Sequence, residues 1–332
     1  MSSKILSIII PMYKVAPYVE RCLRSLTNQD ISFEDYEIIC VNDGSPDNCS
    51  EIVRNLQKEI PNIILIEQEN QGVSMARNNA IAIAKGKYIM AIDPDDYVVM
   101  NTFKRILTLV EKDDLDGLYL GIEIFDITEK SIWNANYDHL KNQILKGVDG
   151  YFSSRGHDVR DPDRSVAILY KKALLEQYDI HYPKNVPLLE DGLFLAKFFT
   201  VAEKVSFDSK KFYQRTTRED SAMNSLSFFS EKAIQGFILA VHDIKAFGSK
   251  NNLNTEQIKL VNHCVAKFVI LALSPSIAMF NFKTYYKTIG ILKKAGLNKL
   301  KTHGLRFLYK KHIKMYNRSK LFFPIYFRLI NR

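Results

Sequence analysis

The stretch YIMAIDPDD, residues 88–96, joins a nearly continuous apolar run to a turn that carries three aspartates. Three runs of the same kind precede it, at residues 6–10, 37–42 and 63–67. Nearly continuous apolar runs are typical of strands that are covered on both faces. We therefore predict four strands in the first part of the chain, the last of them at residues 88–93.

Helical patterns alternate with these strands. Val19, Cys22, Leu23 and Leu26 fall at i, i+3, i+4 and i+7, which places them on one stripe of a helix. A second helix is predicted over residues 74–85, where a glycine follows it. Strands that alternate with helices are typical of βαβ units on a parallel sheet.

Further along the chain the elements are less regular. We predict a helix at 101–111 and, at 117–125, a strand that runs at a sheet edge. Shorter elements follow: a strand at 166–170, a helix at 171–178, a helix at 193–200 that opens at Glu190, a last strand at 211–215, and helices beyond Ser230. The segment 133–163 is polar, turn-rich and aromatic, which is typical of loops that contact a substrate.

Length and composition indicate a large globular core. At 332 residues the chain can form one α/β domain and an appendage. Its 46% hydrophobic and 25% charged residues exclude a disordered or fibrous protein. We predict a doubly wound α/β domain over residues 1–230 and a mostly helical region over 231–332. The cysteines show no metal-ligand spacing, so we predict reduced structural thiols at Cys22, Cys40, Cys49 and Cys264.

The charges of the chain are divided unevenly. The net charge is +9, but the last 76 residues hold 16 Lys and Arg and no acidic residue. The first 256 residues hold 30 basic and 37 acidic residues, so their net charge is −7. The basic end of the chain therefore predicts an anionic partner.

Asp93 and Asp95 follow the fourth predicted strand, at the edge of an open α/β sheet where ligands bind. Two carboxylates there suit a hard divalent cation, Mn²⁺ or Mg²⁺, that also binds substrate phosphates. A simpler interpretation is that Asp95 and Asp96 form a turn and cap the next helix. Polar turns also follow the first two strands, at PMYKV, residues 11–15, and NDGS, residues 42–45.

These three strand ends, with their spacing, resemble those of family-2 glycosyltransferases of the GT-A fold. The resemblance is close over residues 4–100 and looser up to Ser221. It implies a Rossmann-like sheet with helices on both faces, and a metal-dependent enzyme. That enzyme would move a sugar from a nucleotide-diphosphate sugar, expected to be a UDP-sugar, onto a glycan hydroxyl with inversion.

The resemblance also implies roles for individual residues. Asp95 would ligate the metal, and Asp93 would hold the ribose or the metal's water. Asp43 would accept a hydrogen bond from the base, for which a plain β-turn is the alternative. Three residues after the first strand would line the base pocket, and a strand-end turn packed on the core is their alternative: Pro11, Tyr13 and Val15.

Two arginines are expected near the phosphates. Arg77, in NQGVSMARN at residues 70–78, would donate to phosphate, or would form a salt bridge with Asp93 and orient the metal site indirectly. Arg215, with Arg218 and Ser221 after it, matches loosely the basic segment that closes over the diphosphate. Solvated charges are the equal alternative for Arg215.

Glu190 and Asp191 resemble the family's acidic pair at the start of a helix. A sugar hydroxyl attacks well only when a base accepts its proton, and the resemblance assigns that base to Asp191, with Glu190 beside it. The alternative is an acidic first turn that complements the helix dipole. His157, Trp133 and Tyr151 are further candidates for contact with the acceptor.

The basic end mixes Lys and Arg with large apolar residues, as in LRFLYKKHIK at 305–314 and LFFPIYFR at 321–328. Such segments suit an anionic membrane surface, where each basic residue contributes about 1 kcal/mol. The apolar run at 268–280 contains a serine and a proline and is too short to span a bilayer. A solvated helical bundle is one alternative. Nucleic acid is the other, but no nucleic-acid-binding motif accompanies the charge.

The N-terminal apolar run, residues 5–10, is too short for a signal peptide or a membrane span. We therefore expect a cytoplasmic protein, peripheral at the inner face of a bacterial plasma membrane, whose acceptor is a lipid-linked glycan of a capsule, exopolysaccharide or O-antigen. A catalytically silent nucleotide-binding or scaffolding subunit is one alternative function. A nucleotidyltransferase is another, but residues 11–15 lack its glycine-rich basic signature. No feature indicates an oligomeric state.

Overall fold

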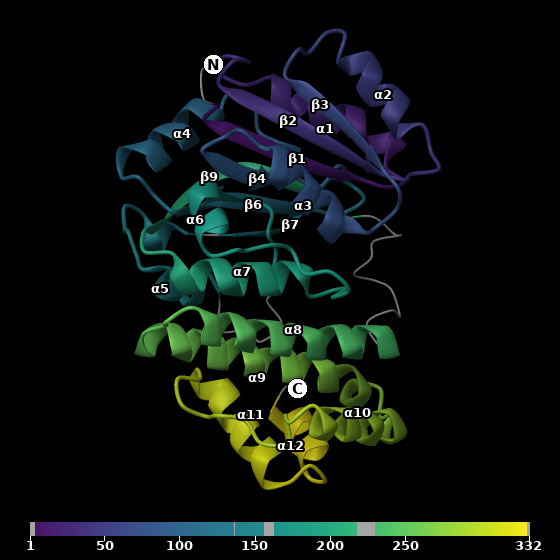
Figure 1. Ribbon diagram of the computed structural model, residues 1–332, viewed down its shortest axis with the longest axis vertical. Helices are drawn as coiled ribbons and strands as arrows, with labels where there is room; N and C mark the ends of the chain where they lie inside the picture. Colours follow the sequence, from purple (N-terminus) through teal and green to yellow (C-terminus); the bar gives the residue numbers. More distant parts are fainter. Residues whose placement is uncertain (1–3, 136, 156–162, 218–229, 331–332) are drawn as a thin grey trace. The chain divides into compact units, whose positions relative to one another are not determined.

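The computed structural model describes residues 4–135, 137–155, 163–217 and 230–330 (Figure 1). The chain divides into two compact units, which we describe separately. The first comprises Met1–Lys184 and Val201–Glu219, and the second comprises Asn185–Thr200 and Asp220–Arg332. The domain boundary predicted at residue 230 directly follows a stretch outside the described residues, and it stays a prediction.

Four parallel strands form one half of the sheet in the first unit, in the order β3-β2-β1-β4. Their bounds are Leu6–Met12 for β1, Tyr36–Asp43 for β2, Ile63–Gln68 for β3 and Tyr88–Ala91 for β4. β1, β2 and β4 are almost wholly buried, because both faces of the sheet are covered there. All four predicted strands are confirmed, each to within about two residues at either end.

The other half of the sheet is mixed. Beyond β4 the order is β8 (Ile168–Lys171), β6 (Gly117–Phe125), β9 (Val205–Thr216) and β5 (Tyr97–Val98), and β7 (Ser131–Asn134) also pairs with β6. The prediction that residues 117–125 form an edge strand is wrong. β6 pairs with β8 and β7 on one side and with the long parallel strand β9 on the other, so it is an interior strand.

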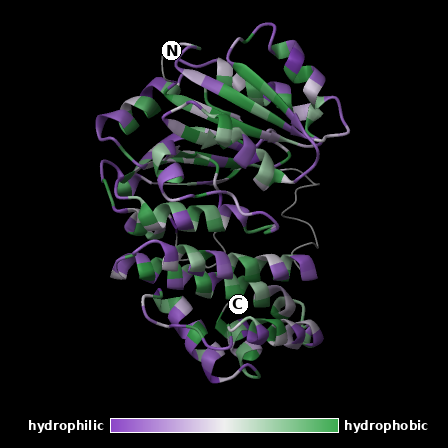
Figure 2. Ribbon diagram, viewed as in Figure 1, coloured by the Kyte–Doolittle hydropathy of each residue, from purple (hydrophilic) through white to green (hydrophobic). Residues whose placement is uncertain are grey.

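Helices of the first unit carry their apolar stripes against this sheet, and Figure 2 shows strands drawn mostly as hydrophobic and helices of mixed colour. Val19, Cys22, Leu23 and Leu26 are the buried residues of α1 (Ala16–Thr27), as predicted. The other elements are α2 (Cys49–Leu56), which the sequence did not predict, α3 (Val73–Ile83), α4 (Phe103–Lys112), η1 (Asp138–Leu140), α5 (Gly147–Ser153) and α6 (Lys172–Gln177). All four cysteines are buried and free, which confirms the predicted thiols.

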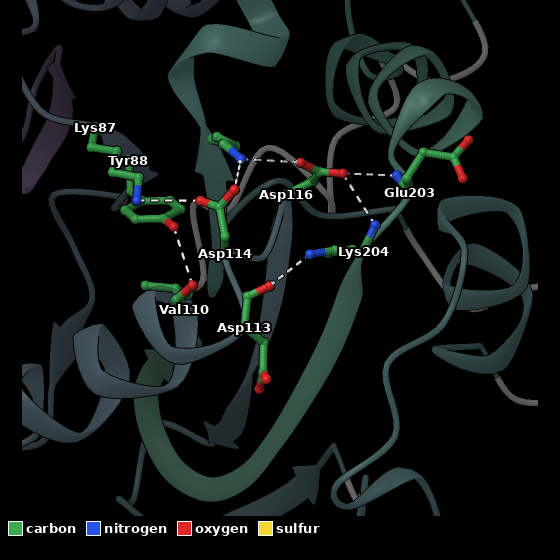
Figure 3. Close-up of polar contacts among 9 residues, drawn as sticks. Lys87, Tyr88, Val110, Asp113, Asp114, Asp116, Glu203 and Lys204 are labelled. Atoms are coloured by element: carbon green, nitrogen blue, oxygen red, sulfur yellow. Dashed lines mark hydrogen bonds and ion pairs between the residues drawn. The ribbon is translucent and has the colours of Figure 1, made fainter.

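A charged network holds the edge of the sheet at which β6 and β9 begin (Figure 3). The Asp116 carboxylate accepts hydrogen bonds from the backbone N–H groups of Glu203 and Lys204, at 2.8 and 3.1 Å. Lys171 Nζ lies 2.8 Å from Asp114 Oδ2, and this hydrogen bond lowers the pKa of the Asp114 carboxyl. These contacts join the ends of β8 and α4 to the start of β9, and they lie at the opposite ends of the strands from the acidic turn.

The second unit consists of helices: most of α7 (Glu190–Val201), then α8 (Glu231–Lys250), α9 (Thr255–Ala278), α10 (Phe282–Lys294), α11 (Phe307–Arg318) and α12 (Phe323–Ile330). Asn254 and Gln257 form a capping box at the start of α9. Lys197 of α7 lies 2.6 Å from Asp243 of α8. The prediction that the chain is helical beyond Ser230 is confirmed for the residues that the structure describes.

Pro275 does not interrupt α9, which runs through it to Ala278. Among the described helices, α9 is the one that is long and apolar enough to cross a membrane, and 78% of its apolar window is buried within the protein. The expectation of an apolar run that is broken and too short is therefore wrong for α9. Its burial makes it the central helix of the second unit, in contact with α8, α10, α11 and α12.

Candidate active site

Three strands that end side by side create the site. β1 lies between β2 and β4, with Met12 in register with Asn42 and Ile9 in register with Ala91. The strand order is thus built outward from β1 in two directions, to β2 and β3 on one side and to β4 on the other. In open α/β sheets, ligands bind where the strand order reverses in this way, beyond the carboxyl ends of the strands. The structure brings the turns after these strands to one edge of the first unit.

The acidic turn after β4 divides its three carboxylates between two tasks. Asp96 is buried, and its carboxylate accepts hydrogen bonds from the Tyr213 hydroxyl at 2.7 Å and the Thr216 N–H at 3.0 Å. Burial raises the pKa of Asp96, and the neighbouring Asp93 and Asp95 raise it further. Asp93 and Asp95 stay partly exposed. Asp96 therefore anchors the turn, while Asp93 and Asp95 remain accessible to a ligand.

The alternative in which Asp96 caps the next helix is wrong. α4 begins at Phe103, after the strand β5, and its N-terminal residue Thr102 makes no side-chain cap. The N–H of Lys104 instead donates to Asp30 at 2.9 Å. The carboxylate that binds the first turn of α4 is therefore that of Asp30, and not one from the acidic turn.

Arg77 forms an ion pair with Asp93. Its guanidinium, 4% exposed, donates to Asp93 Oδ1 at 2.9 Å and lies 5.0 Å from the centre of the Tyr182 ring. This ion pair confirms the predicted salt bridge between Arg77 and Asp93, and its effect on a metal site stays a prediction. Direct contact between Arg77 and a phosphate stays a prediction.

Asp43 holds the loop that leads into α3. Its carboxylate accepts hydrogen bonds from Gln68 Nε2, Gln71 N–H and Gly72 N–H, each at 2.8 Å. Its side chain is buried, and Gly72 adopts a left-handed φ of 87° that favours glycine. Each carboxylate oxygen has two lone pairs, so Oδ2, which accepts one bond, can accept another from a base. That role stays a prediction.

The three residues predicted to line a base pocket differ in exposure. Pro11 is buried and Val15 is 4% exposed, whereas Tyr13 is 44% exposed. An exposed aromatic ring at a ligand-binding edge offers a stacking face. Tyr13 is therefore the one of the three whose side chain is open to a ligand, and the base contacts of all three stay predictions.

The sequence reading missed Asp47, which joins the turns after β1 and β2. It accepts from Ala16 N–H at 2.8 Å and from Ser45 Oγ at 2.7 Å, and Ser45 Oγ in turn accepts from Lys14 N–H at 2.8 Å. Partial burial opposes ionisation, but the hydrogen bonds from Ala16, Cys49 and Ser45 outweigh it and lower the pKa of Asp47 to about 2. The only sequence signal was the turn composition SPDN.

Arg21 was missed as well. From α1 its guanidinium donates to the Asp95 carbonyl at 2.9 Å and to Thr216 Oγ1 at 3.1 Å. The same group lies 4.7 Å from the centre of the Tyr97 ring. Arg21 therefore ties α1 and β9 to the backbone of the acidic turn. Its position off the apolar stripe of α1 was the only sequence signal.

Two predicted residues lie in one row across the sheet. Ile124 of β6 is in register with Arg215 of β9 on one side and with Trp133 of β7 on the other. Trp133 is 40% exposed, and the Arg164 guanidinium lies 4.8 Å from its ring centre. This row belongs to the carboxyl half of β6, on the same edge of the sheet as the acidic turn.

Four further residues were predicted to contact the acceptor or the diphosphate. Tyr151 is fully buried, and the Arg155 guanidinium lies 3.5 Å from the centre of its ring. This burial contradicts the prediction that Tyr151 contacts an acceptor. His157, Arg218 and Ser221 lie outside the described residues.

Glu190 and Asp191 occupy the first turn of α7 and are both partly exposed. They belong to the second unit, whereas the acidic turn belongs to the first. An acidic first turn also complements the helix dipole, as in the alternative interpretation. Their catalytic roles stay predictions.

The described residues contain no cluster of three or more His, Cys, Asp or Glu side chains arranged to hold a metal ion. Mg²⁺-type ions are commonly held by one or two carboxylates together with substrate phosphates. Asp93 and Asp95 are two partly exposed oxygen donors, and their role as metal ligands stays a prediction.

The fold is shared with solved glycosyltransferase structures. S. aureus TarS, residues 1–349, in complex with UDP-GlcNAc has a TM-score of 0.71 and 20% identity, over 95% of this chain and 88% of that chain. The mannosyltransferase PcManGT from Pyrobaculum calidifontis, in complex with GDP-Man and Mn²⁺, has a TM-score of 0.54 and 14% identity, over 100% and 89%. At these identities the similarity shows the fold, which is the mixed α/β GT-A fold of the glycosyltransferases.

Residues 7–174 match the model of glycosyl transferase family 2. The chain belongs to this family, which confirms the resemblance read from its strand ends. The poly(ribitol-phosphate) beta-glucosyltransferase of Bacillus spizizenii is 28% identical over 271 residues. The aligned part is 77% of this chain and 39% of that relative, so the chain spans well under two thirds of the relative's length.

Proposed function

We propose that this glycosyltransferase moves a sugar from a nucleotide-diphosphate sugar, with UDP as the nucleotide, onto a hydroxyl of a lipid-linked glycan or polymer of the bacterial surface. The observation that carries the proposal is the acidic turn of Asp93 and Asp95, at the edge shared by β1, β2 and β4 within the matched region. The UDP-GlcNAc of the TarS complex and the polymer in the name of the Bacillus spizizenii relative support this donor and acceptor.

A divalent cation, Mn²⁺ or Mg²⁺, completes the donor site in this proposal. Asp95 and Asp93 would hold it, and it would neutralise the negative charge that develops on the departing diphosphate. Arg77 forms an ion pair with Asp93, and Tyr213 and Arg21 bind backbone groups of the turn. Tyr213 and Thr216 also donate to the Asp96 carboxylate. These contacts fix the turn on both sides, which suits a site that must position a leaving group.

The nucleotide would lie along the turns after β1 and β2. Tyr13 offers an exposed ring for stacking on the base, and Asp43 retains an acceptor position for an imide N–H. Pro11 and Val15 would support the floor of this pocket. Arg215, near the carboxyl end of the strand β9, would face the diphosphate.

In the chemical step, a carboxylate accepts the proton of the acceptor hydroxyl while that oxygen attacks the anomeric carbon. The bond between the anomeric carbon and the diphosphate oxygen breaks, and the electron pair leaves with the nucleoside diphosphate. Attack from the side opposite the leaving group inverts the configuration. We assign the base to Asp191, with Glu190 beside it, because a carboxylate in a partly exposed first turn is accessible to a sugar hydroxyl.

The test is a screen of UDP-, GDP- and dTDP-sugars for Mn²⁺-dependent hydrolysis and for transfer to membrane-extracted acceptors. The wild-type protein is expected to select a UDP-sugar. Asp191→Asn is expected to bind that donor as the wild type does and to lose transfer, by roughly a hundredfold or more, because the base is removed while the charge-neutral isostere keeps the shape.

Glu190→Gln is the matched comparison, since it removes the neighbouring carboxylate in the same turn. A larger loss in Glu190→Gln than in Asp191→Asn would move the base to Glu190. A wild-type protein that binds UDP with Mn²⁺ and turns over no nucleotide sugar with any acceptor would refute the proposal and favour a silent binding subunit.

A further inference from the structure

The last helix exposes an apolar stripe. Leu321, Phe322, Ile325 and Leu329 are 62%, 57%, 57% and 66% exposed, and they fall at i, i+1, i+4 and i+8. This spacing places them on one side of α12 and the turn that precedes it. We call these four residues the α12 apolar face.

The opposite side of α12 fixes this orientation. Phe323 is fully buried, with its ring centre 5.7 Å from that of Tyr316, and Phe327 lies 4.9 Å from His312. These aromatic contacts dock α12 on α11. Because one side of the helix is committed to the core of the second unit, the α12 apolar face is held outward and cannot turn inward without breaking those contacts.

The turn between α9 and α10 extends the same surface. The Arg328 guanidinium lies 3.2 Å from the centre of the Phe280 ring and donates to the Ile277 carbonyl at 3.3 Å. At the other end of α12, the Tyr285 hydroxyl of α10 donates to the Lys320 carbonyl at 2.8 Å. Phe280 is 61% exposed, so an apolar residue from another helix adjoins the α12 apolar face.

The surroundings of this surface are cationic. Lys310, Lys311, Lys314 and Arg318 lie on the exposed side of α11, and the segment 257–332 contains no acidic residue that could pair with them. Within the part of the chain that the structure describes, none of these four forms an ion pair with a carboxylate. Arg318 also leads directly into the α12 apolar face, three residues before Leu321.

We propose that the second unit binds the surface of an anionic lipid bilayer, with the α12 apolar face and Phe280 in the interface and the cations of α11 and α12 at the headgroups. Large apolar side chains beside lysine and arginine are what such an interface requires. This surface belongs to the second unit and the acidic turn to the first, and the proposal stands independently of the sugar-transfer reaction.

The positive charge of this surface favours an anionic membrane over a second copy of the chain, and its apolar residues favour a membrane over nucleic acid. A symmetric contact with a second copy would bring two unmatched cationic surfaces together, which is electrostatically unfavourable. A nucleic-acid backbone would satisfy the lysines, but it offers no apolar environment for Leu321, Ile325 or Leu329. A membrane of anionic lipid satisfies both the apolar and the cationic parts.

The experiment is co-sedimentation of the full chain with phosphatidylcholine vesicles that contain or lack phosphatidylglycerol. The wild type is expected to bind the anionic vesicles and to be released by salt. The double variant Ile325→Asp/Leu329→Asp is expected to lose at least about tenfold in partitioning, because it removes two apolar anchors and adds negative charge.

The matched control is Leu239→Asp/Ile258→Asp, which changes the same residue types at exposed positions of α8 and α9 and adds the same charge. It is expected to bind anionic vesicles nearly as the wild type does. Circular dichroism checks that both variants keep their helices. Hydrolysis of the donor in solution should be equal in both variants, so a failed sugar-transfer reaction and a failed membrane proposal give different results.

Three outcomes would overturn the proposal. One is a wild type that ignores anionic vesicles. Another is an equal loss of binding in the two double variants, since binding would then depend on net charge alone. The third is a wild-type dimer by light scattering that becomes a monomer in Ile325→Asp/Leu329→Asp with vesicle binding unchanged, which would assign the face to a second copy.

Discussion

The Tyr213 hydroxyl donates to the Asp96 carboxylate at 2.7 Å and accepts from the Asp93 N–H at 3.1 Å. One phenol from β9 thus holds both ends of the acidic turn after β4. Burial raises the pKa of Tyr213, so its hydroxyl stays protonated and remains a donor. The position of Asp93, a proposed metal ligand, therefore depends on a residue 120 positions away in the sequence.

Replacing this hydroxyl should loosen the turn. Tyr213→Phe keeps the ring and removes both hydrogen bonds, which should lower the free energy of unfolding by about 1–3 kcal/mol. The Kd of Mn²⁺ in the presence of UDP, measured by calorimetry, should rise several-fold, because Asp93 and Asp95 are less firmly positioned.

Tyr170→Phe is the control for that change. Tyr170 is equally buried and donates to the Ser165 carbonyl at 2.9 Å, away from the acidic turn. It should reduce stability to a similar extent and leave the Mn²⁺ affinity unchanged. Equal effects of the two variants on Mn²⁺ affinity would mean that Tyr213 contributes only general stability.

The ion pair between Arg77 and Asp93 allows a double-mutant cycle. If Arg77 acts only through Asp93, Arg77→Met and Asp93→Asn should each weaken Mn²⁺-dependent UDP binding, and the double variant should bind no worse than Asp93→Asn. Isothermal calorimetry of the four proteins measures this. An additional loss of tenfold or more in the double variant would show that Arg77 contacts the nucleotide directly.

Much of the fold could be predicted from local patterns, and the parts that could not depend on distant contacts. The apolar runs of β1 to β4 predicted those strands because burial on both faces leaves a continuous signature. The interior position of β6 could not be predicted in the same way. It depends on pairing with β9, as between Ile124 and Arg215, and no local pattern specifies that partner.

The residues of the candidate site likewise include some that local sequence patterns predicted and some that they did not. The prediction that Asp93 and Asp95 face a ligand came from residue type, spacing and the family resemblance, and the structure leaves both side chains partly exposed. Their metal ligation stays a prediction. Arg21 and Asp47 were not predicted, since each acts through backbone groups of a turn far away in the sequence. Their side-chain types are common on solvated surfaces, so only the folded structure identifies them.

Trp133 should contribute to acceptor binding if the row that it shares with Arg215 faces the glycan. Trp133→Ala is expected to raise the acceptor KM by about tenfold, because an aromatic face that stacks on a sugar is lost, while donor hydrolysis without acceptor stays unchanged. Steady-state kinetics at saturating donor measure this. Ile132→Ala, an exposed neighbour on the same strand, should alter neither quantity, and an unchanged acceptor KM in Trp133→Ala would exclude the contact.

His312 should make the second unit sensitive to acid. Burial lowers the pKa of its imidazole from 6.5 to about 4, so the folded state favours the neutral ring. A folded-state pKa below the unfolded value means that this stabilisation is complete above pH 6.5 and is lost as the pH falls from 6.5 to about 4.

His312→Leu should flatten the fall in stability over that interval, by an amount on the order of 1–3 kcal/mol. Urea unfolding followed by circular dichroism at several pH values measures the difference from the wild type. His242→Leu changes an exposed histidine of α8 and should leave the pH profile as it is in the wild type. Parallel profiles for wild type and His312→Leu would contradict the prediction.

The central claim is that the turn after β4 binds a divalent cation together with the diphosphate of the donor. Calorimetric titration of UDP into the wild type and into Asp95→Ala, with and without Mn²⁺, tests it directly. We predict that Mn²⁺ strengthens UDP binding at least tenfold in the wild type and has no effect on Asp95→Ala. Equal enhancement by Mn²⁺ in both proteins would contradict the claim.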